Sequence, residues 1–104
     1  VAANCPIERR FSISQSQTSN WAHGMPQWKV NVTNKCSCAQ SQVKLNCNGF
    51  QTTFVENPSI LNISANVCLL KSGYPIGMDE TVEFLYAWLP EFPFQPISSI
   101  GDCN

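Results

Sequence analysis

Charged side chains are scarce in this sequence. Asp, Glu, Lys and Arg make up only 12% of the 104 residues, about half the usual share, and the net charge is −1. Phosphate binding draws its affinity from clustered Lys and Arg, and a cationic membrane peptide needs a basic face. No apolar run approaches the roughly 20 residues that span a bilayer. We therefore expect no nucleic-acid partner and no membrane insertion.

Groups for acid–base or nucleophilic chemistry are also few. The single histidine, His23, lies beside Gly24 in an expected loop, and the seven carboxylates are scattered along the chain. No glycine-rich phosphate loop and no nucleophile elbow occurs. We therefore predict a protein that is not an enzyme, with no catalytic residue, no cofactor and no metal.

Cysteine, by contrast, is plentiful. The chain carries six, namely Cys5, Cys36, Cys38, Cys47, Cys68 and Cys103. An even count in a short chain predicts a disulfide framework formed in an oxidising compartment, so we expect a secreted, extracellular protein. The two cysteines separated by one serine would strain a direct bridge, so each is expected to bond elsewhere. The sequence leaves the other pairings open, and its spacing fits a zinc site poorly.

Hydrophobic residues recur with a period of two. Trp28, Val30 and Val32 alternate with polar residues, as in a strand with one buried face. Residues 67–71 and 97–100 are further strand candidates. With a hydrophobic content of 43%, this pattern predicts an all-β fold with a real core. We expect residues 1–104 to form one domain, a disulfide-stapled antiparallel β-sandwich of about six to eight short strands.

Two details of this sandwich can be predicted. Residues 43–47 alternate and are followed by Asn48-Gly49, a strong signal for a type I′ hairpin. We therefore predict that residues 43–47 pair with residues 50–54. Residues 81–89 are apolar on both faces, which predicts a central strand covered on both sides.

Several surface features are candidates for binding a partner. Pro90, Pro93 and Pro96 favour an extended loop that would present aromatic side chains. Lys29 and Lys44 fall on the predicted polar face of the strands, together with Gln51. The residues predicted to contact a protein partner are Phe92, Phe94, Glu91, Arg9, Arg10, Lys29 and Lys44. The dibasic pair among them has two other interpretations, a solvated strand edge or a proteolytic processing site.

Two N-glycosylation sequons begin at Asn31 and Asn62, which makes both asparagines candidate modification sites. Asn31 falls on the polar side of its predicted strand, where a glycan fits. A glycan there would block the face that carries Lys29.

Several strings, taken in order, resemble the plant tapetum determinant family of small secreted cysteine-rich proteins. They are Cys5, Ile13-Ser14-Gln15-Ser16, Gln27-Trp28-Lys29-Val30-Asn31-Val32, Cys36-Ser37-Cys38, Val43-Lys44-Leu45-Asn46-Cys47-Asn48-Gly49-Phe50-Gln51, Pro58-Ser59-Ile60-Leu61, Cys68-Leu69-Leu70, Tyr86-Ala87-Trp88 and Cys103. The resemblance implies an extracellular signalling ligand that a leucine-rich-repeat receptor kinase ectodomain recognises. It also implies a role in anther and tapetum cell fate or a related developmental pathway, and it makes the six cysteines the family's structural ones.

The alternative function is a cell-wall carbohydrate-binding module. Such modules stack sugars on a flat row of exposed aromatic side chains, and low charge is compatible with this. The alternating pattern places Trp28 on the buried face of its strand. This leaves Trp21 and Tyr74 as the aromatic residues that are free to bind a sugar.

Overall fold

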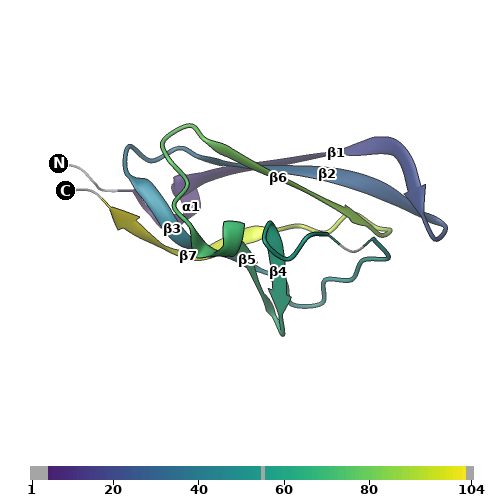
Figure 1. Ribbon diagram of the computed structural model, residues 1–104. Coiled ribbons are helices and arrows are strands. Elements are labelled where there is room, and N and C mark those ends of the chain that lie inside the picture. Colours follow the sequence, from purple (N-terminus) through teal and green to yellow (C-terminus); the bar gives the residue numbers. More distant parts are fainter. Residues whose placement is uncertain (1–4, 55, 103–104) are drawn as a thin grey trace.

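The computed structural model describes residues 5–54 and 56–102, which form two antiparallel β-sheets packed face to face (Figure 1). One sheet holds β1 (Phe11–Ala22), β2 (Met25–Asn34) and β6 (Thr81–Ala87) in the order β1-β2-β6. The other has the order β4-β5-β3-β7, built from β3 (Ala39–Asn46), β4 (Leu61–Ser64), β5 (Val67–Leu70) and β7 (Gln95–Asp102). The helical turns α1 (Ile7–Arg10) and η1 (Lys71–Gly73) complete the described part. The predicted all-β antiparallel sandwich is confirmed.

Both sheets contribute to one core. Val30 and Val32 of β2 are fully buried, as are Val43 and Leu45 of β3, so the alternating pattern marks the inner faces as predicted. Trp28 is half-buried at the edge of this core, and its indole N–H donates a hydrogen bond to the Trp88 carbonyl (3.0 Å). The alternating pattern therefore predicted correctly which side chains of β2 and β3 face the core.

The predicted pairing of residues 43–47 with residues 50–54 is wrong. A turn is present, because the Phe50 N–H donates to the Cys47 carbonyl (3.0 Å), but only Gly49 of the two central residues has a positive φ. Residues 50–54 form no strand, since β5 and β7 already occupy the two edges of β3. The type I′ geometry lies elsewhere, between β1 and β2, where His23 (φ 52°) and Gly24 (φ 82°) form a two-residue loop.

Residues 81–89 also differ from the prediction. β6 ends at Ala87 and lies at the edge of its sheet rather than at the centre. Side chains cover its open edge: Thr52 Oγ1 accepts from the Ala87 N–H (2.9 Å) and Glu56 Oε2 from the Leu85 N–H (2.8 Å). The segment that was expected to be a hairpin strand therefore protects β6 from edge-to-edge pairing.

Two disulfides lie in the described part, Cys5–Cys36 and Cys47–Cys68, with sequence separations of 31 and 21. Cys36 thus pairs with Cys5 and not with its neighbour Cys38, as predicted. Cys103 lies outside the described residues, so a third bridge stays a prediction. Loops of this length make each described bridge worth about 3–4 kcal/mol through restriction of the unfolded chain.

The molecule is elongated, with extents of 48 × 25 × 20 Å. The β1–β2 turn lies at one end of the long axis, and α1 and the end of β7 lie towards the other (Figure 1). We call residues 17–28 the hairpin arm, and the opposite end, which contains the Cys5–Cys36 bridge, the crosslinked end. Neither α1 nor η1, the helical turns of the described chain, has the length and hydropathy needed to cross a membrane.

Candidate recognition surfaces

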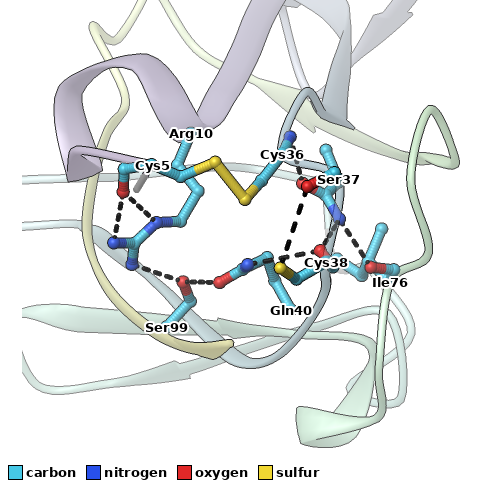
Figure 2. The surroundings of a disulfide bond; sticks show 9 residues. Cys5, Arg10, Cys36, Ser37, Cys38, Gln40, Ile76 and Ser99 are labelled. Atoms are coloured by element: carbon cyan, nitrogen blue, oxygen red, sulfur yellow. Dashed lines mark hydrogen bonds between the residues drawn. A yellow bond between two sulfur atoms is a disulfide. The ribbon is translucent and has the colours of Figure 1, made fainter. Parts of the chain in front are cut away.

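A buried polar network closes the crosslinked end (Figure 2). The Arg10 guanidinium donates twice to the Cys5 carbonyl (3.0 and 2.6 Å) and once to Ser99 Oγ (2.9 Å). Ser99 in turn donates to Gln40 Oε1 (2.6 Å), whose amide N–H donates to the Cys38 carbonyl (3.3 Å). Arg10 therefore ties the N-terminal turn to β7 and is directed inward. Of the predicted dibasic contact, only Arg9 is exposed.

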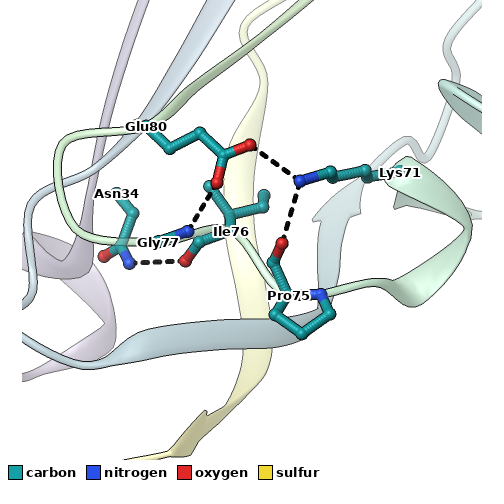
Figure 3. A network of polar contacts seen from close by, with 6 residues as sticks. All are labelled: Asn34, Lys71, Pro75, Ile76, Gly77 and Glu80. Atoms are coloured by element: carbon teal, nitrogen blue, oxygen red, sulfur yellow. Dashed lines mark hydrogen bonds and ion pairs between the residues drawn. The ribbon is translucent and has the colours of Figure 1, made fainter.

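Asn34 is the centre of a second buried network. Its side chain is fully buried, and Nδ2 donates to the carbonyls of Cys38 (2.9 Å) and Ile76 (2.8 Å; Figure 3). Oδ1 accepts from the Cys36 N–H (2.8 Å). One amide thus holds the β2–β3 connection against the segment that precedes β6. Because every buried amide atom here is paired, the network stabilises this end without an orphaned polar group.

Next to this network the chain makes a left-handed turn. Lys71, Ser72 and Gly73 all have positive φ, at 55°, 54° and 83°. For residues other than glycine this region costs about 1–2 kcal/mol each. The turn places Tyr74 on the surface, where it is 67% exposed, in agreement with the prediction that this ring is free.

An ion pair holds the left-handed turn (Figure 3). Lys71 Nζ lies 2.7 Å from Glu80 Oε2 and donates to the Pro75 carbonyl (2.9 Å). Glu80 Oε1 accepts from the Gly77 N–H (2.7 Å). The Lys71 hydrogen bond, with that of Gly77, holds the pKa of the Glu80 carboxyl below its ordinary value.

The hairpin arm is held by neutral groups only. No charged residue occurs between Arg10 and Lys29. The β1–β2 register shifts between Gln17 and Trp21, and this irregularity is bridged by Gln27, whose Oε1 accepts from Thr18 Oγ1 (2.9 Å) and Asn20 Nδ2 (3.3 Å). Trp21 is 65% exposed, as predicted. The strand pair that carries this residue was not predicted from the sequence.

The proline-rich segment does not present its aromatic rings. Phe94 is only 6% exposed and packs against Phe50, Phe84 and Tyr86, with ring centroids 5.0–5.5 Å apart. Phe92 is half-buried in the same cluster. The prediction that these rings contact a receptor is corrected for Phe94, because its surface is used by the core. Glu91, which precedes Phe92 in the sequence, is exposed.

A hydrogen-bonded ring anchors this cluster. The Tyr86 hydroxyl donates to Gln15 Oε1 (2.6 Å) and accepts from the Phe92 N–H (2.9 Å), while Gln15 Nε2 donates to the Phe92 carbonyl (2.7 Å). Burial raises the pKa of the Tyr86 hydroxyl to about 12. The three groups link β1, β6 and the segment before β7, so the proline-rich segment is a fixed part of the core.

Lys29 and Lys44 do not share a face. Lys29 lies on the outer side of β2 and Lys44 on the outer side of β3, and these two sheets pack against each other through their inner faces. The two lysines therefore lie on opposite sides of the sandwich. Gln51, which was grouped with them, is exposed in the segment that follows Gly49 and belongs to neither sheet. The prediction that these three residues form a single polar contact face is wrong.

The two sequon asparagines differ in setting. Asn31 lies in the middle of the outer sheet face, opposite Ser14 on one side and Glu83 on the other, and is partly exposed. Asn62 is exposed on the edge strand β4. Glycosylation of Asn31 or Asn62 stays a prediction.

A cleft of about 250 Å³ opens beside Asn62, between the covered edge of β6 and β4. Its lining is mainly apolar and includes Phe50, Phe54, Leu61 and Leu85. Within the described residues, no group of three or more His, Cys, Asp or Glu side chains lies close enough together to hold a metal ion.

Comparison with known proteins places the chain in a family. Residues 7–103 match the family described as Tapetum determinant 1, C-terminal. The chain belongs to the tapetum determinant 1 family. The resemblance drawn from the cysteines and the strings between them is thereby confirmed.

Three relatives show how far the similarity to tapetum determinant 1 proteins extends. An uncharacterized protein of Arabidopsis thaliana is 30% identical over 97 residues, which cover 89% of this chain and 74% of that protein. The TPD1 protein homolog 1B of Oryza sativa subsp. japonica is 29% identical over 82 residues, 77% of this chain and 48% of its own length. The TPD1 protein homolog 1 of Arabidopsis thaliana is 25% identical over 89 residues, covering 83% and 50%. The chain thus spans about half the length of the two TPD1 homologues. No solved structure matches it.

Proposed function

We propose that this protein is an extracellular signalling ligand that a leucine-rich-repeat receptor kinase recognises during plant reproductive development, in anther and tapetum cell-fate specification or a related pathway. The observation that carries the proposal is the family match over residues 7–103. The protein acts by recognition through its surface and not by catalysis.

The disulfide bonds support secretion to the apoplast. Bridges such as Cys5–Cys36 and Cys47–Cys68 persist in oxidising compartments and are rare in the cytosol. The crosslinked sandwich also suits a ligand. A surface that is already ordered before binding loses little conformational entropy when a receptor ectodomain engages it.

The test is binding of the folded, oxidised protein to a panel of purified leucine-rich-repeat receptor ectodomains, measured by biolayer interferometry. Saturable binding to one ectodomain, and none to most others, is the expected result. The reduced and alkylated protein serves as the control and should not bind, because its surface is no longer ordered. Absence of binding to every ectodomain by the folded protein would contradict the proposal.

The carbohydrate-binding alternative has less support in the aromatic side chains. Trp21 lies on the arm of the β1-β2-β6 sheet, whereas Tyr74 follows η1, which packs against β3, β4 and β5 of the other sheet. These two exposed rings therefore form no row on one face. A pull-down on cell-wall polysaccharides with Trp21→Ala as control tests this function; retention that the substitution abolishes would favour it over the receptor ligand.

A further inference from the structure

The arm end exposes two large apolar side chains that the core does not use. Trp21 is 65% exposed and Leu89 is 61% exposed. Trp21 lies opposite Pro26 in the β1–β2 register, and the Pro26 carbonyl accepts from the Trp88 N–H (3.2 Å). Leu89, which follows Trp88, is therefore at the same end of the sandwich as Trp21. Figure 1 shows the connection from β6 to β7 approaching the arm at this end.

The backbone beneath these side chains is fixed from three directions. The type I′ loop at His23 and Gly24 sets the twist of the two strands. Gln27 bridges the β1 irregularity just before Trp21. On the third side, Thr53 Oγ1 donates to the Ala22 carbonyl (2.6 Å), next to Trp21 in the chain. These contacts fix the backbone from which the exposed indole ring projects.

An exposed tryptophan on a fixed backbone is a typical centre of a protein–protein contact. Energetic hot spots are enriched in Trp, which gains a large apolar burial for the loss of only two side-chain torsions. The arm also carries no Asp, Glu, Lys or Arg, so its complement is not a strongly acidic or basic surface, and the exposed rings and methyl groups of Trp21 and Leu89 fit an apolar patch. The molecule is elongated, with shorter extents of 25 × 20 Å, and an end of such a body fits a concave partner. Solenoid repeat proteins supply such extended concave surfaces.

We infer that Trp21, with Leu89 at the same end of the sandwich, is the anchor by which this protein binds an apolar patch on the concave face of a leucine-rich-repeat ectodomain. The inference rests on the proposed function and names the contact within it. The crosslinked end, with Tyr74 and the ion-paired turn, stays outside the contact.

The experiment compares Trp21→Ala with Tyr74→Ala in binding to the ectodomain that the unmodified protein recognises. The two rings are matched in exposure, but Trp21 lies in β1, whereas Tyr74 follows η1, which packs against the other sheet. We expect Trp21→Ala to weaken binding by on the order of 30-fold or more, and Tyr74→Ala by less than about twofold. Leu89→Asp should also weaken binding, by roughly tenfold, because it places a charge in an apolar contact. Unchanged thermal unfolding of each variant excludes loss of the fold as the cause.

The outcomes separate this inference from the proposed function. Equal binding by Trp21→Ala and the unmodified protein, or a larger loss with Tyr74→Ala, overturns the inference and leaves the receptor-ligand function in place. Binding of the unmodified protein to no ectodomain overturns both. Salt provides a second readout: the Kd should change by less than about twofold between 50 and 500 mM NaCl, since the contact is uncharged. A steep salt dependence would assign binding to the lysine or arginine side chains and overturn the inference.

Discussion

The two ends of this sandwich are ordered by different chemistry. The crosslinked end combines a disulfide, the buried amides of Asn34 and Gln40, and an ion pair, and most of these groups are shielded from water. The hairpin arm has neither charge nor covalent bridge, and its hydrogen bonds lie close to solvent. A bond shielded from water contributes more when made and costs more when broken. The crosslinked end therefore stabilises the fold, while the hairpin arm carries the exposed ring of Trp21 on a fixed backbone.

Among the tests of this difference between the two ends, removal of the Cys5–Cys36 bridge is expected to lower stability the most. We expect the double substitution Cys5→Ala/Cys36→Ala to lower the free energy of unfolding by about 3–4 kcal/mol, since a loop of 31 residues is released in the unfolded chain. Urea denaturation followed by circular dichroism measures this. Trp21→Ala on the arm is the control and should change stability by less than about 0.5 kcal/mol. A comparable loss in the control would break the distinction between the two ends.

Asn34→Ala tests the amide network of the crosslinked end. The substitution leaves the Cys36 N–H and the carbonyls of Cys38 and Ile76 without their partner in a buried site. We expect a loss of roughly 2–4 kcal/mol.

The matched variant on the arm is Gln27→Ala, which removes an amide that is also buried. Here the loss should be about 1 kcal/mol, because the released Thr18 and Asn20 side chains can bind water instead. Both values come from urea unfolding. Equal losses at Asn34 and Gln27 would show that shielding from solvent does not separate the two ends.

Tyr86 tests the region between the ends through its pH dependence. The folded protein holds the pKa of this hydroxyl at about 12, above its ordinary value of 10.0, so the unfolded chain loses the proton first. The stability that this group contributes is complete below pH 10.0 and is lost as the pH rises towards about 12. We expect Tyr86→Phe to be about 1–2 kcal/mol less stable at neutral pH, because Gln15 and Phe92 lose a partner. Its stability should fall less steeply at alkaline pH than that of the unmodified protein; parallel pH profiles would contradict this assignment.

The smallest effect is expected for the Lys71–Glu80 pair, which is partly exposed. Because the pKa of Glu80 is lowered in the folded protein, its contribution is present above the ordinary value of 4.5 and is lost as the pH falls through the lowered value. Glu80→Gln should therefore remove a small acid-dependent loss of stability, measured by urea unfolding at pH 7 and at pH 3–4. An unchanged acid profile would indicate that the left-handed turn does not depend on this carboxylate.

The strand facing could be predicted from single residues, because a period of two assigns one side of each strand to the core. Val30, Val32, Val43 and Leu45 follow this rule. The choice of partner strand could not be predicted in the same way. Asn48-Gly49 satisfies a hairpin turn locally, but the Cys47–Cys68 bridge and the β5 pairing place other strands beside β3.

The exposure of the candidate contact residues could also be predicted only in part. The sequence marked Trp21 and Tyr74 as free, and both are exposed. It also marked Phe94 and Arg10, whose side chains are directed inward by partners that include Phe50 and Ser99, which lie far away in the chain. A loop position rich in proline favours exposure, yet a ring moves inward when the core offers it apolar contacts.

The sequence by itself determined the class of this protein: strands with one apolar face, an even set of cysteines, little charge and membership of the tapetum determinant 1 family. These properties depend on composition, short-range periodicity and the order of motifs. Tertiary structure alone decided which strands pair, which cysteines of the described chain are bonded and which aromatic rings reach the surface. The physical reason is that pairing and burial depend on contacts between residues distant in sequence, and several arrangements satisfy the local pattern equally well.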